Sequence, residues 1–363
     1  MVNLKDLQVI VNQFDIQSGI EKIETLESGH INDTYLVTTH KGKCYVLQKL
    51  NTNVFKDIES IITNKAAVSE HLKQLESPYK SVSFVKAKDS NYYYKDNNGN
   101  YWNIMDYISN CVTHDVASNT KMVFEAGKLY GDFIKQTASL SSSTIKETLP
   151  SFHSVPLRFL QFEKALKKAS SKNIANAKRE IDFAIKCKEE MSELAILKNE
   201  DVFPIRITHN DAKLSNILFN QKEEGLAVID LDTIMPGIVH FDFGDSIRSI
   251  CTNTIEDSND FENTFIKLDY YKAFCEGHAQ ATKDILTHQE IKYLPLGVKT
   301  IIFIMGLRFL TDFLNENIYY KVKYKSHNLI RCKNQFKLVK SVQQHYDNII
   351  EITNKCYNLN NIS

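Results

Sequence analysis

The amino-acid sequence predicts an α+β protein of two lobes, a small antiparallel sheet lobe followed by a larger, mainly helical lobe. Apolar and polar residues alternate at the period of a β-strand through much of the first hundred residues, around one helical segment. From about residue 120 the apolar residues recur at helical spacing, and short strands interrupt this pattern between residues 205 and 232. We therefore expect an N-terminal lobe of residues 1–107, a C-terminal lobe of residues 108–363, and a binding cleft between them.

The N-terminal lobe is expected to contain two hairpins and one long helix. Strands are predicted over residues 34–39, 44–50, 81–87 and 91–108. The first two form a hairpin around a turn at residues 40–42. A second hairpin turn falls at residues 97–100, because the Asn and Gly residues there tolerate positive φ. Apolar residues at helical spacing predict the helix over residues 54–75.

The C-terminal lobe is expected to consist of amphipathic helices around a few short strands. The predicted elements are helices over residues 121–140, 155–171 and 177–197, strands over residues 204–208, 216–220 and 226–232, and further helices to the C-terminus. The strands therefore lie at the centre of an otherwise helical lobe.

The charge balance gives no sign of a nucleic-acid or membrane partner. Lys plus Arg and Asp plus Glu each number 44, so the formal net charge is zero. The longest apolar run near the C-terminus, residues 300–307, is bounded by Lys299 and Arg308 and is too short to cross a membrane. We expect small-molecule partners instead.

The cysteines and the N-terminal residues favour a reducing, cytoplasmic setting. Seven cysteines are scattered without a CxxC pair, and the odd number argues against a disulfide framework or a zinc ribbon. The first residues carry acidic and amide side chains early and no long apolar core, which does not match a signal peptide.

The residues that carry the chemistry are expected in two polar clusters beside short apolar strands. The first cluster contains Asp211 and Asn216, and the second contains Asp230 and Asp232. In this order one carboxylate can meet a hydroxyl group, while the amide and the second carboxylate hold a divalent cation. Magnesium prefers a few hard oxygen ligands, so Asn216 and Asp230 suffice if a nucleotide supplies phosphate oxygens.

Taken singly, each of these aspartates is more often structural than catalytic, as the cap of a turn or the end of a strand. The spacing H-x-D-x-x-x-x-N of residues 209–216, however, is expected by chance only about a few hundredths of a time in such a chain. The stretch from His240 to Asp242 repeats H-x-D but lacks the later Asn. The combined pattern therefore favours the functional interpretation.

These clusters resemble a known superfamily. The stretch 209–216 is similar to the catalytic loop of protein kinases and, more closely, of the aminoglycoside phosphotransferase and choline kinase group, and residues 228–232 resemble the metal-binding segment of that group. Longer stretches are similar to the N-acetylhexosamine 1-kinases: residues 28–37, 45–55, 209–218, 228–248 and 306–322. The resemblance implies a protein-kinase-like fold and ATP-dependent phosphorylation, with Mg²⁺, of the anomeric hydroxyl of N-acetylglucosamine or N-acetylgalactosamine.

The resemblance also implies roles for individual residues. Asp211 takes the position of the catalytic base, Asn216 and Asp230 take the magnesium positions, and Lys213 lies near the transferring phosphate. The positions near the sugar are those of Asp232, Thr233, Arg308 and Tyr319, with Asp245 as a further candidate. For Asp245 an ion pair with Arg248 is the structural alternative. By similarity, Asp242 braces the catalytic loop.

The expected nucleotide contacts lie in the N-terminal lobe. The stretch from Gly29 to Thr34 occupies the place of a glycine-rich loop but has one glycine, so it would rely on backbone amides and on Asn32, Asp33 and Thr34. At the hinge, backbone groups between Met105 and Tyr107 are expected to bind adenine.

The first hairpin departs from the protein-kinase pattern. Gln48 stands where a protein kinase has its strand lysine, and Lys49 should point to the opposite face because strand side chains alternate. Either Gln48 contacts the nucleotide or Lys49 reaches round to it; a solvated Lys49 is the plain alternative. No helix glutamate, neither Glu59 nor Glu70, is assigned as a partner.

Two other functions remain open at the level of sequence. The same fold could phosphorylate an amino alcohol, such as choline or homoserine, or an aminoglycoside; an aminoglycoside requires an acidic pocket and choline an aromatic cage. A non-catalytic kinase-like binding module is a further alternative, against which the intact Asp211, Asn216 and Asp230 argue.

Overall fold

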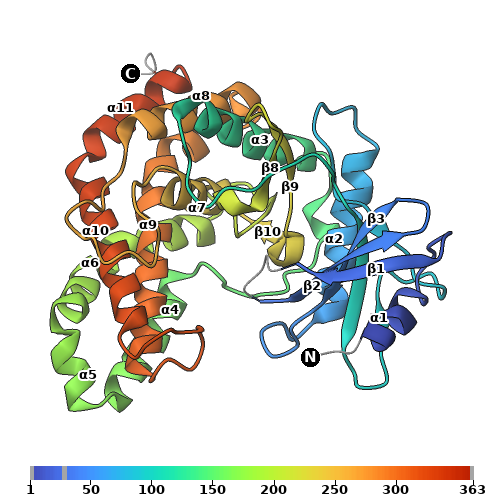
Figure 1. Cartoon of the computed structure of the whole chain (residues 1–363). Coiled ribbons are helices and arrows are strands. Elements are labelled where there is room, and N and C mark those ends of the chain that lie inside the picture. The colour runs from blue at the N-terminus through green and yellow to red at the C-terminus, as the bar shows by residue number, and fades with distance from the viewer. Residues whose placement is uncertain (1–3, 27–30, 360–363) are drawn as a thin grey trace.

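The chain folds into two lobes that face each other across an open side of the molecule (Figure 1). The structure is a computed structural model that describes residues 4–26 and 31–359. An antiparallel sheet with two helices forms the N-terminal lobe, and helices around two short two-stranded sheets form the C-terminal lobe. The predicted α+β class and the order of the two lobes are confirmed.

The N-terminal lobe is built on a six-stranded antiparallel sheet with the order β1-β2-β3-β6-β4, in which β5 pairs with β6. Its elements are α1 (Leu4–Val11), β1 (Ile20–Thr25), β2 (Asp33–Thr39), β3 (Cys44–Lys49), α2 (Ile58–Lys73), β4 (Phe84–Val85), β5 (Tyr94–Lys95) and β6 (Tyr101–Asp106). Both predicted hairpins are present. Thr34 pairs with Gln48 in the first, and Gly99 has a φ of +78° in the turn of the second.

The two faces of this sheet are covered by different helices. Leu7 and Val11 of α1 pack with Leu47 and Trp102 on one face. Ile61 and Ile62 of α2 belong to a second buried cluster on the other face. The side chains of Gln48 and Lys49 therefore separate, since neighbours on a strand point to opposite faces. Gln48 faces α2, and the Lys49 ammonium lies 5.9 Å from the Trp102 ring.

The C-terminal lobe begins with α3 and holds its short strands in the middle of the helical sequence, as predicted. Its elements are α3 (Thr120–Thr137), α4 (Val155–Lys168), α5 (Ser171–Asn176), α6 (Lys178–Asn199), β7 (Arg206–Thr208), β8 (Ile217–Phe219), β9 (Gly225–Val228), β10 (Met235–Gly237), α7 (Val239–Ile250), α8 (Leu268–Thr282), α9 (His288–Leu314), α10 (His327–Gln344) and α11 (Tyr346–Cys356). Single 3-10 turns lie at Ser142–Thr144, Leu214–Asn216 and Leu231–Thr233.

Helices α3 and α8 touch backbone to backbone because glycines face each other where they cross. A Cβ atom on Gly127 would lie 2.2 Å from the carbonyl oxygen of Phe274, and one on Gly277 would lie 2.1 Å from that of Phe124. Neither distance is compatible with a side chain, so the approach of the two helices requires glycine at both positions.

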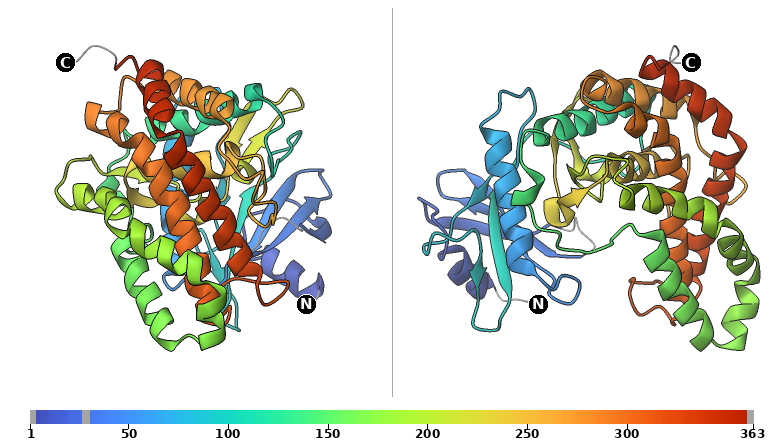
Figure 2. Two further views of the ribbon diagram at one scale, coloured as in Figure 1. Left: turned by 90° about the vertical axis from the view of Figure 1, so that its left-hand side faces the viewer. Right: turned by 180° about the vertical axis from the view of Figure 1, so that it is seen from behind.

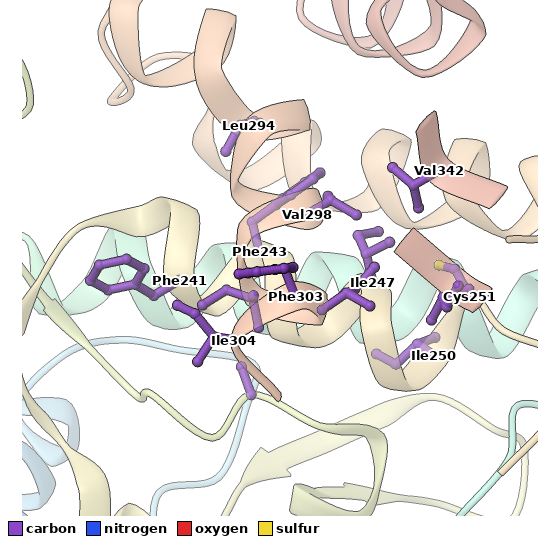
Figure 3. Packing of buried hydrophobic residues seen from close by; sticks show 14 of the residues in the cluster. Phe241, Phe243, Ile247, Ile250, Cys251, Leu294, Val298, Phe303, Ile304 and Val342 are labelled. Carbon is purple, nitrogen blue, oxygen red and sulfur yellow. The ribbon is translucent and has the colours of Figure 1, made fainter. Parts of the chain in front are cut away.

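The core of the C-terminal lobe lies between α7, α9 and α10, where Phe243, Ile247, Phe303 and Val342 are buried (Figure 3). Figure 2 shows α9 and α10 side by side along the molecule. Among the described helices, α9 alone is long and apolar enough to span a membrane, but 83% of its most apolar 18-residue window is buried inside the protein. It is therefore packed as the central helix of this lobe.

Candidate active site

The loop after β7 is held in place by a single carboxylate from α7. Asp242 is 3% exposed and accepts hydrogen bonds from the backbone N–H groups of His209 and Asn210, both at 2.7 Å. Asn210 has a φ of +62°, a conformation in which Asn is better tolerated than most residues. Asp242 thus braces the loop of residues 209–216, as expected.

His209 and Asn210 tie this loop to the segment that follows β9. His209 Nε2 lies 2.8 Å from the carbonyl oxygen of Ile229, and the Asn210 amide donates to the carbonyl oxygen of Thr233 at 3.1 Å. The Thr233 hydroxyl in turn donates to the His209 carbonyl at 2.7 Å. The polarity of this stretch within a buried region is therefore explained by internal hydrogen bonds, and Thr233 takes part in them.

Asp211 points away from this buried network and forms a charged cluster with two residues of its own loop. Lys213 Nζ and Asn216 Nδ2 lie 2.8 Å and 2.9 Å from Asp211 Oδ2. Burial acts to raise the pKa of Asp211, but the Lys213 ammonium and the Asn216 amide outweigh burial and lower the pKa to about 2. Asp211 is therefore a carboxylate at neutral pH, with one third of its side chain exposed.

Asp230 lies at the end of β9 in a left-handed conformation, with φ +61° and ψ +58°. Its carboxylate forms no hydrogen bond or ion pair with the residues of 4–26 and 31–359, and it keeps contact with solvent. Partial loss of hydration beside the surrounding protein, followed by the carboxylates of Asp232 and Asp211, raises the pKa of Asp230 to about 7, although the residue is exposed. Three carboxylates therefore lie close together, and that of Asp230 has no cation from the described residues, which makes this a site that attracts a positive ion.

The residues around Asp230 fit a hard divalent cation. Asn216 uses its amide N–H₂ group toward Asp211, which leaves its Oδ1 atom as an acceptor, and the Asp230 carboxylate is also without a donor among the described residues. Two such oxygens, completed by phosphate and water, are the ligand set that Mg²⁺ prefers. No cluster of three His, Cys, Asp or Glu side chains that could hold a metal alone occurs in the described chain.

Asp232 is engaged by two residues of the N-terminal lobe. It is 5% exposed; its Oδ1 forms an ion pair with Lys65 of α2, and its Oδ2 accepts a hydrogen bond from Asn32. The sequence predicted neither contact. Lys65 could have been found as a charged residue on the apolar stripe of the predicted helix, between Ile62 and Ala66.

The remaining nucleotide candidates lie along β2, β3 and the hinge. Thr34 and Gln48 are paired across β2 and β3, and the Gln48 side-chain oxygen accepts from Lys65 at 3.3 Å. Asp33 is exposed beside them, whereas Gly29 lies outside the described residues. At the hinge, Met105 packs in a small apolar cluster. The N–H groups of Tyr107 and Asp106 donate to the carbonyl oxygens of Cys44 at 3.2 Å and Ser83 at 2.8 Å, so both of these hinge donors are already engaged.

Neither helix glutamate approaches Gln48 or Lys49. Glu59 accepts a hydrogen bond from Tyr101 at 3.1 Å, and Glu70 pairs with Lys73 at 3.3 Å. The cross-strand neighbour of Gln48 is Asn103, which is 0% exposed and whose two side-chain polar atoms have no partner in the part of the chain that the structure describes.

Asp245 forms the ion pair that was the structural alternative at the level of sequence. Its Oδ1 lies 2.7 Å from Arg248 Nε, both side chains are buried, and Arg248 also contacts Glu256 at 2.7 Å. Asp245 is nonetheless close enough to the catalytic loop to act on the pKa of Lys213, which it helps to raise after Asp211 and Asp230.

Arg308 and Tyr319 meet in a cluster of aromatic side chains. The Arg308 guanidinium lies 5.8 Å from the Tyr319 ring and 5.2 Å from the Phe152 ring. Arg158 of α4 lies 5.8 Å from the same Phe152 ring, and its Nε atom is buried without a partner among the described residues. Burial, followed by the charge of Arg308, lowers the pKa of Arg158 to about 10.

These arginines stand beside the catalytic loop. His153 Nε2 lies 3.3 Å from the carbonyl oxygen of Asn210, the residue before Asp211. Burial, followed by the positive charges of Arg308 and Arg158, lowers the pKa of His153 to about 3. Arg158 was missed at the level of sequence because nothing in its helix distinguishes it from the other charged residues there.

The fold and this arrangement define a protein-kinase-like phosphotransferase. The model of a family described as the phosphotransferase enzyme family matches residues 22–263, and the chain belongs to this family. Similar solved structures include an aminoglycoside phosphotransferase from Alicyclobacillus acidocaldarius, with 13% identity, 96% of this chain and 97% of that chain covered, and a TM-score of 0.62.

Two further structures share the fold. An amicoumacin kinase in complex with AMP-PNP, Ca²⁺ and Ami has 13% identity, covers 93% of each chain and has a TM-score of 0.63. An ethanolamine kinase from Plasmodium vivax has 14% identity, covers 87% of this chain and 82% of that chain, and has a TM-score of 0.56. At these identities the likeness establishes the bilobal fold alone.

Proposed function

We propose that this protein is a small-molecule kinase that transfers the γ-phosphoryl group of ATP to the anomeric hydroxyl of an N-acetylhexosamine, giving the sugar 1-phosphate. The loop with Asp211, Lys213 and Asn216, facing the free carboxylate of Asp230, supports phosphoryl transfer. The choice of acceptor is supported by the resemblance of the chain to N-acetylhexosamine 1-kinases and by the distribution of charge around the loop.

The distribution of charge is the observation that carries the acceptor proposal. Three carboxylates near the loop each have a cation from the protein: Asp211 has Lys213, Asp232 has Lys65, and Asp245 has Arg248. In contrast, the guanidinium groups of Arg158 and Arg308 donate to Gln161, a carbonyl oxygen and a sulfur, and form no ion pair within the described residues.

A pocket of this kind disfavours cationic acceptors. A polycationic aminoglycoside requires uncompensated carboxylates, and the only such carboxylate identified at the loop, that of Asp230, is assigned to the metal. Choline requires an aromatic cage, but the rings of Phe152 and Tyr319 already lie against the guanidinium groups of Arg158 and Arg308, whose positive charge opposes a second cation. A neutral sugar has hydroxyl and acetamide oxygens that accept hydrogen bonds from guanidinium groups, and aromatic rings such as those of Tyr319 and Phe152 can pack against it.

The mechanism assigned to these residues is a direct in-line transfer. The Asp211 carboxylate accepts a hydrogen bond from the anomeric hydroxyl and orients its oxygen toward the γ-phosphorus. As the bond from this oxygen to the γ-phosphorus forms, the bond to the β,γ-bridging oxygen of ATP breaks and ADP leaves, while the hydroxyl proton passes to Asp211. The Lys213 ammonium lies close enough to exchange its contact with Asp211 for one with the transferring phosphoryl group. Asn216 and Asp230 would hold Mg²⁺, whose charge stabilises the phosphate oxygens.

The other expected contacts are part of the same proposal. Asn32, Asp33, Thr34 and Gln48 face the phosphates, the backbone from Met105 to Tyr107 faces adenine, and Thr233, Arg308 and Tyr319 face the sugar. The nucleotide lobe is then residues 1–107 and the acceptor lobe residues 108–363. The seven cysteines form no disulfide, which supports the proposed cytoplasmic location.

A coupled assay of ADP release tests this function. The acceptor panel contains N-acetylglucosamine, N-acetylgalactosamine, glucose, choline, ethanolamine and an aminoglycoside, each with Mg²⁺ and ATP, and the Asp211→Asn variant is the blank. The proposal expects release with the N-acetylhexosamines and a product whose phosphorus resonance couples to the anomeric proton. Release with choline or an aminoglycoside alone would contradict the sugar acceptor, and no release with any acceptor would favour a binding module.

A further inference from the structure

Lys65 is a buried cation that the proposed chemistry leaves unused. Its side chain is 2% exposed and lies in the middle of α2, where it contacts Asp232 Oδ1, Gln48 Oε1 at 3.3 Å and the Phe84 ring at 5.4 Å. A lysine is seldom buried to this extent unless a carboxylate compensates its charge. The compensating carboxylate here belongs to the other lobe, so the ion pair joins the two lobes.

The partner of Lys65 stands two residues after the proposed metal ligand Asp230. After β9 ends at Val228, the chain adopts the left-handed conformation at Asp230 and enters the 3-10 turn Leu231–Thr233. This conformation costs a non-glycine residue some energy, so contacts that hold the backbone on either side of Asp230 help to maintain it. The side before Asp230 is fixed at Ile229, whose N–H donates to the Asn216 carbonyl at 2.9 Å and whose carbonyl meets His209.

The side after Asp230 is fixed from α2. Lys65 and Asn32 occupy the two oxygens of Asp232. The residue before Lys65, Asn64, is also buried and donates to the carbonyl oxygen of Ile234 at 3.1 Å. Two neighbouring residues of α2 thus hold the segment of residues 232–234, and Lys65 is the one that does so with a charge.

We propose that Lys65 is a positioning residue for the metal and nucleotide site, and that it acts through Asp232 by fixing the turn that presents Asp230 to the cleft. The inference rests on the proposed nucleotide and metal site and adds to it a residue that touches neither ligand. It also gives Asp232 a positioning role in place of a direct contact with the acceptor. Without Lys65, the Asp232 carboxylate would be buried beside Asp230 without a cation, and the turn would move to expose it.

Binding of Mg²⁺·ADP, measured by calorimetry, tests this role without any acceptor. The variants are Lys65→Met, Lys65→Arg, and Lys65→Met combined with Asp232→Asn. Lys73→Met is the matched control, since Lys73 lies on the same helix, pairs with Glu70 and is exposed. Thermal unfolding of each variant accompanies the titration.

The proposal expects Lys65→Met to weaken Mg²⁺·ADP binding by about tenfold or more, Lys65→Arg to recover part of the loss, and Lys73→Met to bind as the wild type. The double variant removes the unpaired carboxylate, so its melting temperature should return toward that of the wild type while its affinity stays low. If Lys65→Met does not fold, the double variant alone decides.

Wild-type affinity in Lys65→Met or in the double variant would overturn the positioning role, because Lys65 would then only neutralise Asp232. A wild-type protein that binds no Mg²⁺·ADP would instead overturn the proposed function, and the positioning role with it. Binding by the wild type therefore tests the proposed function, and the difference between the wild type and the Lys65 variants tests the positioning role.

Discussion

The ammonium group of Lys213 lies 2.8 Å from Asp211 Oδ2, so the proposed base and its nearest cation are paired within the same loop. About one third of each side chain remains exposed to the cleft. The pair keeps Asp211 ionised and leaves Lys213 able to turn toward a phosphate that enters beside it. The charges of Asp211 and Lys213 therefore cancel before the nucleotide binds. When it binds, its negatively charged phosphates can form an ion pair with the Lys213 ammonium.

Replacement of Lys213 by Met tests this exchange. We expect kcat to fall by about tenfold or more and the KM for ATP to rise, because the phosphoryl group loses a cation in the transition state. Steady-state kinetics at saturating acceptor measure both values. Lys222→Met, which changes an exposed lysine of the β8–β9 turn, is the control. An unchanged kcat with Lys213→Met would remove Lys213 from the phosphate site.

The brace at Asp242 predicts a loss of activity from a change that keeps the side-chain shape. In Asp242→Asn the amide N–H₂ group would face one of the two backbone N–H donors of His209 and Asn210, so one hydrogen bond is replaced by repulsion. We expect the free energy of unfolding to fall by about 1–3 kcal/mol and kcat to fall with it. Urea unfolding and turnover check this, with the exposed Asp269→Asn as control. Wild-type values in both would contradict the brace.

A pH dependence of stability follows from three buried histidines. Burial lowers the pKa of His153, His240 and His278 to about 3. Below their ordinary pKa of about 6.5 the unfolded chain takes up protons that the folded chain does not, so stability falls as the pH falls from about 6.5 toward 3. The raised pKa values of Asp230 and Asp242 act in the opposite direction below about pH 7, since the folded protein retains their protons.

Replacement of one histidine isolates its contribution. In His278→Gln the slope of the unfolding free energy against pH, between about pH 6 and pH 4, should decrease by about 1.4 kcal/mol per pH unit. Urea unfolding at several pH values gives the slope for both proteins. Equal slopes would mean that His278 is protonated in the folded state, in spite of its burial beside Tyr357 and Thr282.

The contact between α3 and α8 predicts that a single methyl group is not tolerated at Gly127. The added Cβ would lie 2.2 Å from the Phe274 carbonyl oxygen, which belongs to a backbone that cannot rotate away. Gly127→Ala should lower the free energy of unfolding by about 1–3 kcal/mol, although alanine favours a helix. Lys135→Ala on the exposed face of α3 should change it by less than about 0.5 kcal/mol. A neutral Gly127→Ala would show that the helices are further apart.

The sequence was sufficient for the lobes and for both hairpins of the sheet lobe, because each depends on residues close together in the chain. Apolar and polar residues alternate on both sides of the turns at residues 40–42 and 97–100, and this pattern determines which strands pair. The polar stretch after β7 is recognisable from the fixed spacing of His209, Asp211 and Asn216. The brace by Asp242 joins residues more than 30 positions apart and was expected only from the resemblance to the family. The assignments of Asp211, Asn216 and Asp230 to catalysis and metal binding stay predictions. The sequence predicted neither α1 nor β1, because their apolar residues form a recognisable buried face only when they pack against the rest of the sheet.

Lys65 and Arg158 were missed for a different physical reason. Each lies in a predicted amphipathic helix, where a lysine or an arginine is ordinarily solvated, and only the tertiary packing buries it near the loop. The partners of Lys65 lie 17 and 167 residues away, a separation that no local pattern encodes. The positions of Asp232 and Thr233 in the motif placed them near the expected sugar site. Their positions did not predict the contacts that the two side chains make with Lys65, Asn32 and His209.

The central claim is that Asp211 orients the acceptor hydroxyl during phosphoryl transfer, and the kinetics of Asp211→Asn test it most directly. Asn has nearly the size of Asp, so the variant should still bind ATP and the sugar. We therefore expect kcat to fall by about two to four orders of magnitude, while the KM values for ATP and for the sugar change by less than about threefold. The assay uses N-acetylglucosamine or N-acetylgalactosamine with saturating Mg²⁺ and ATP. A kcat within about tenfold of the wild type would contradict the assignment of Asp211.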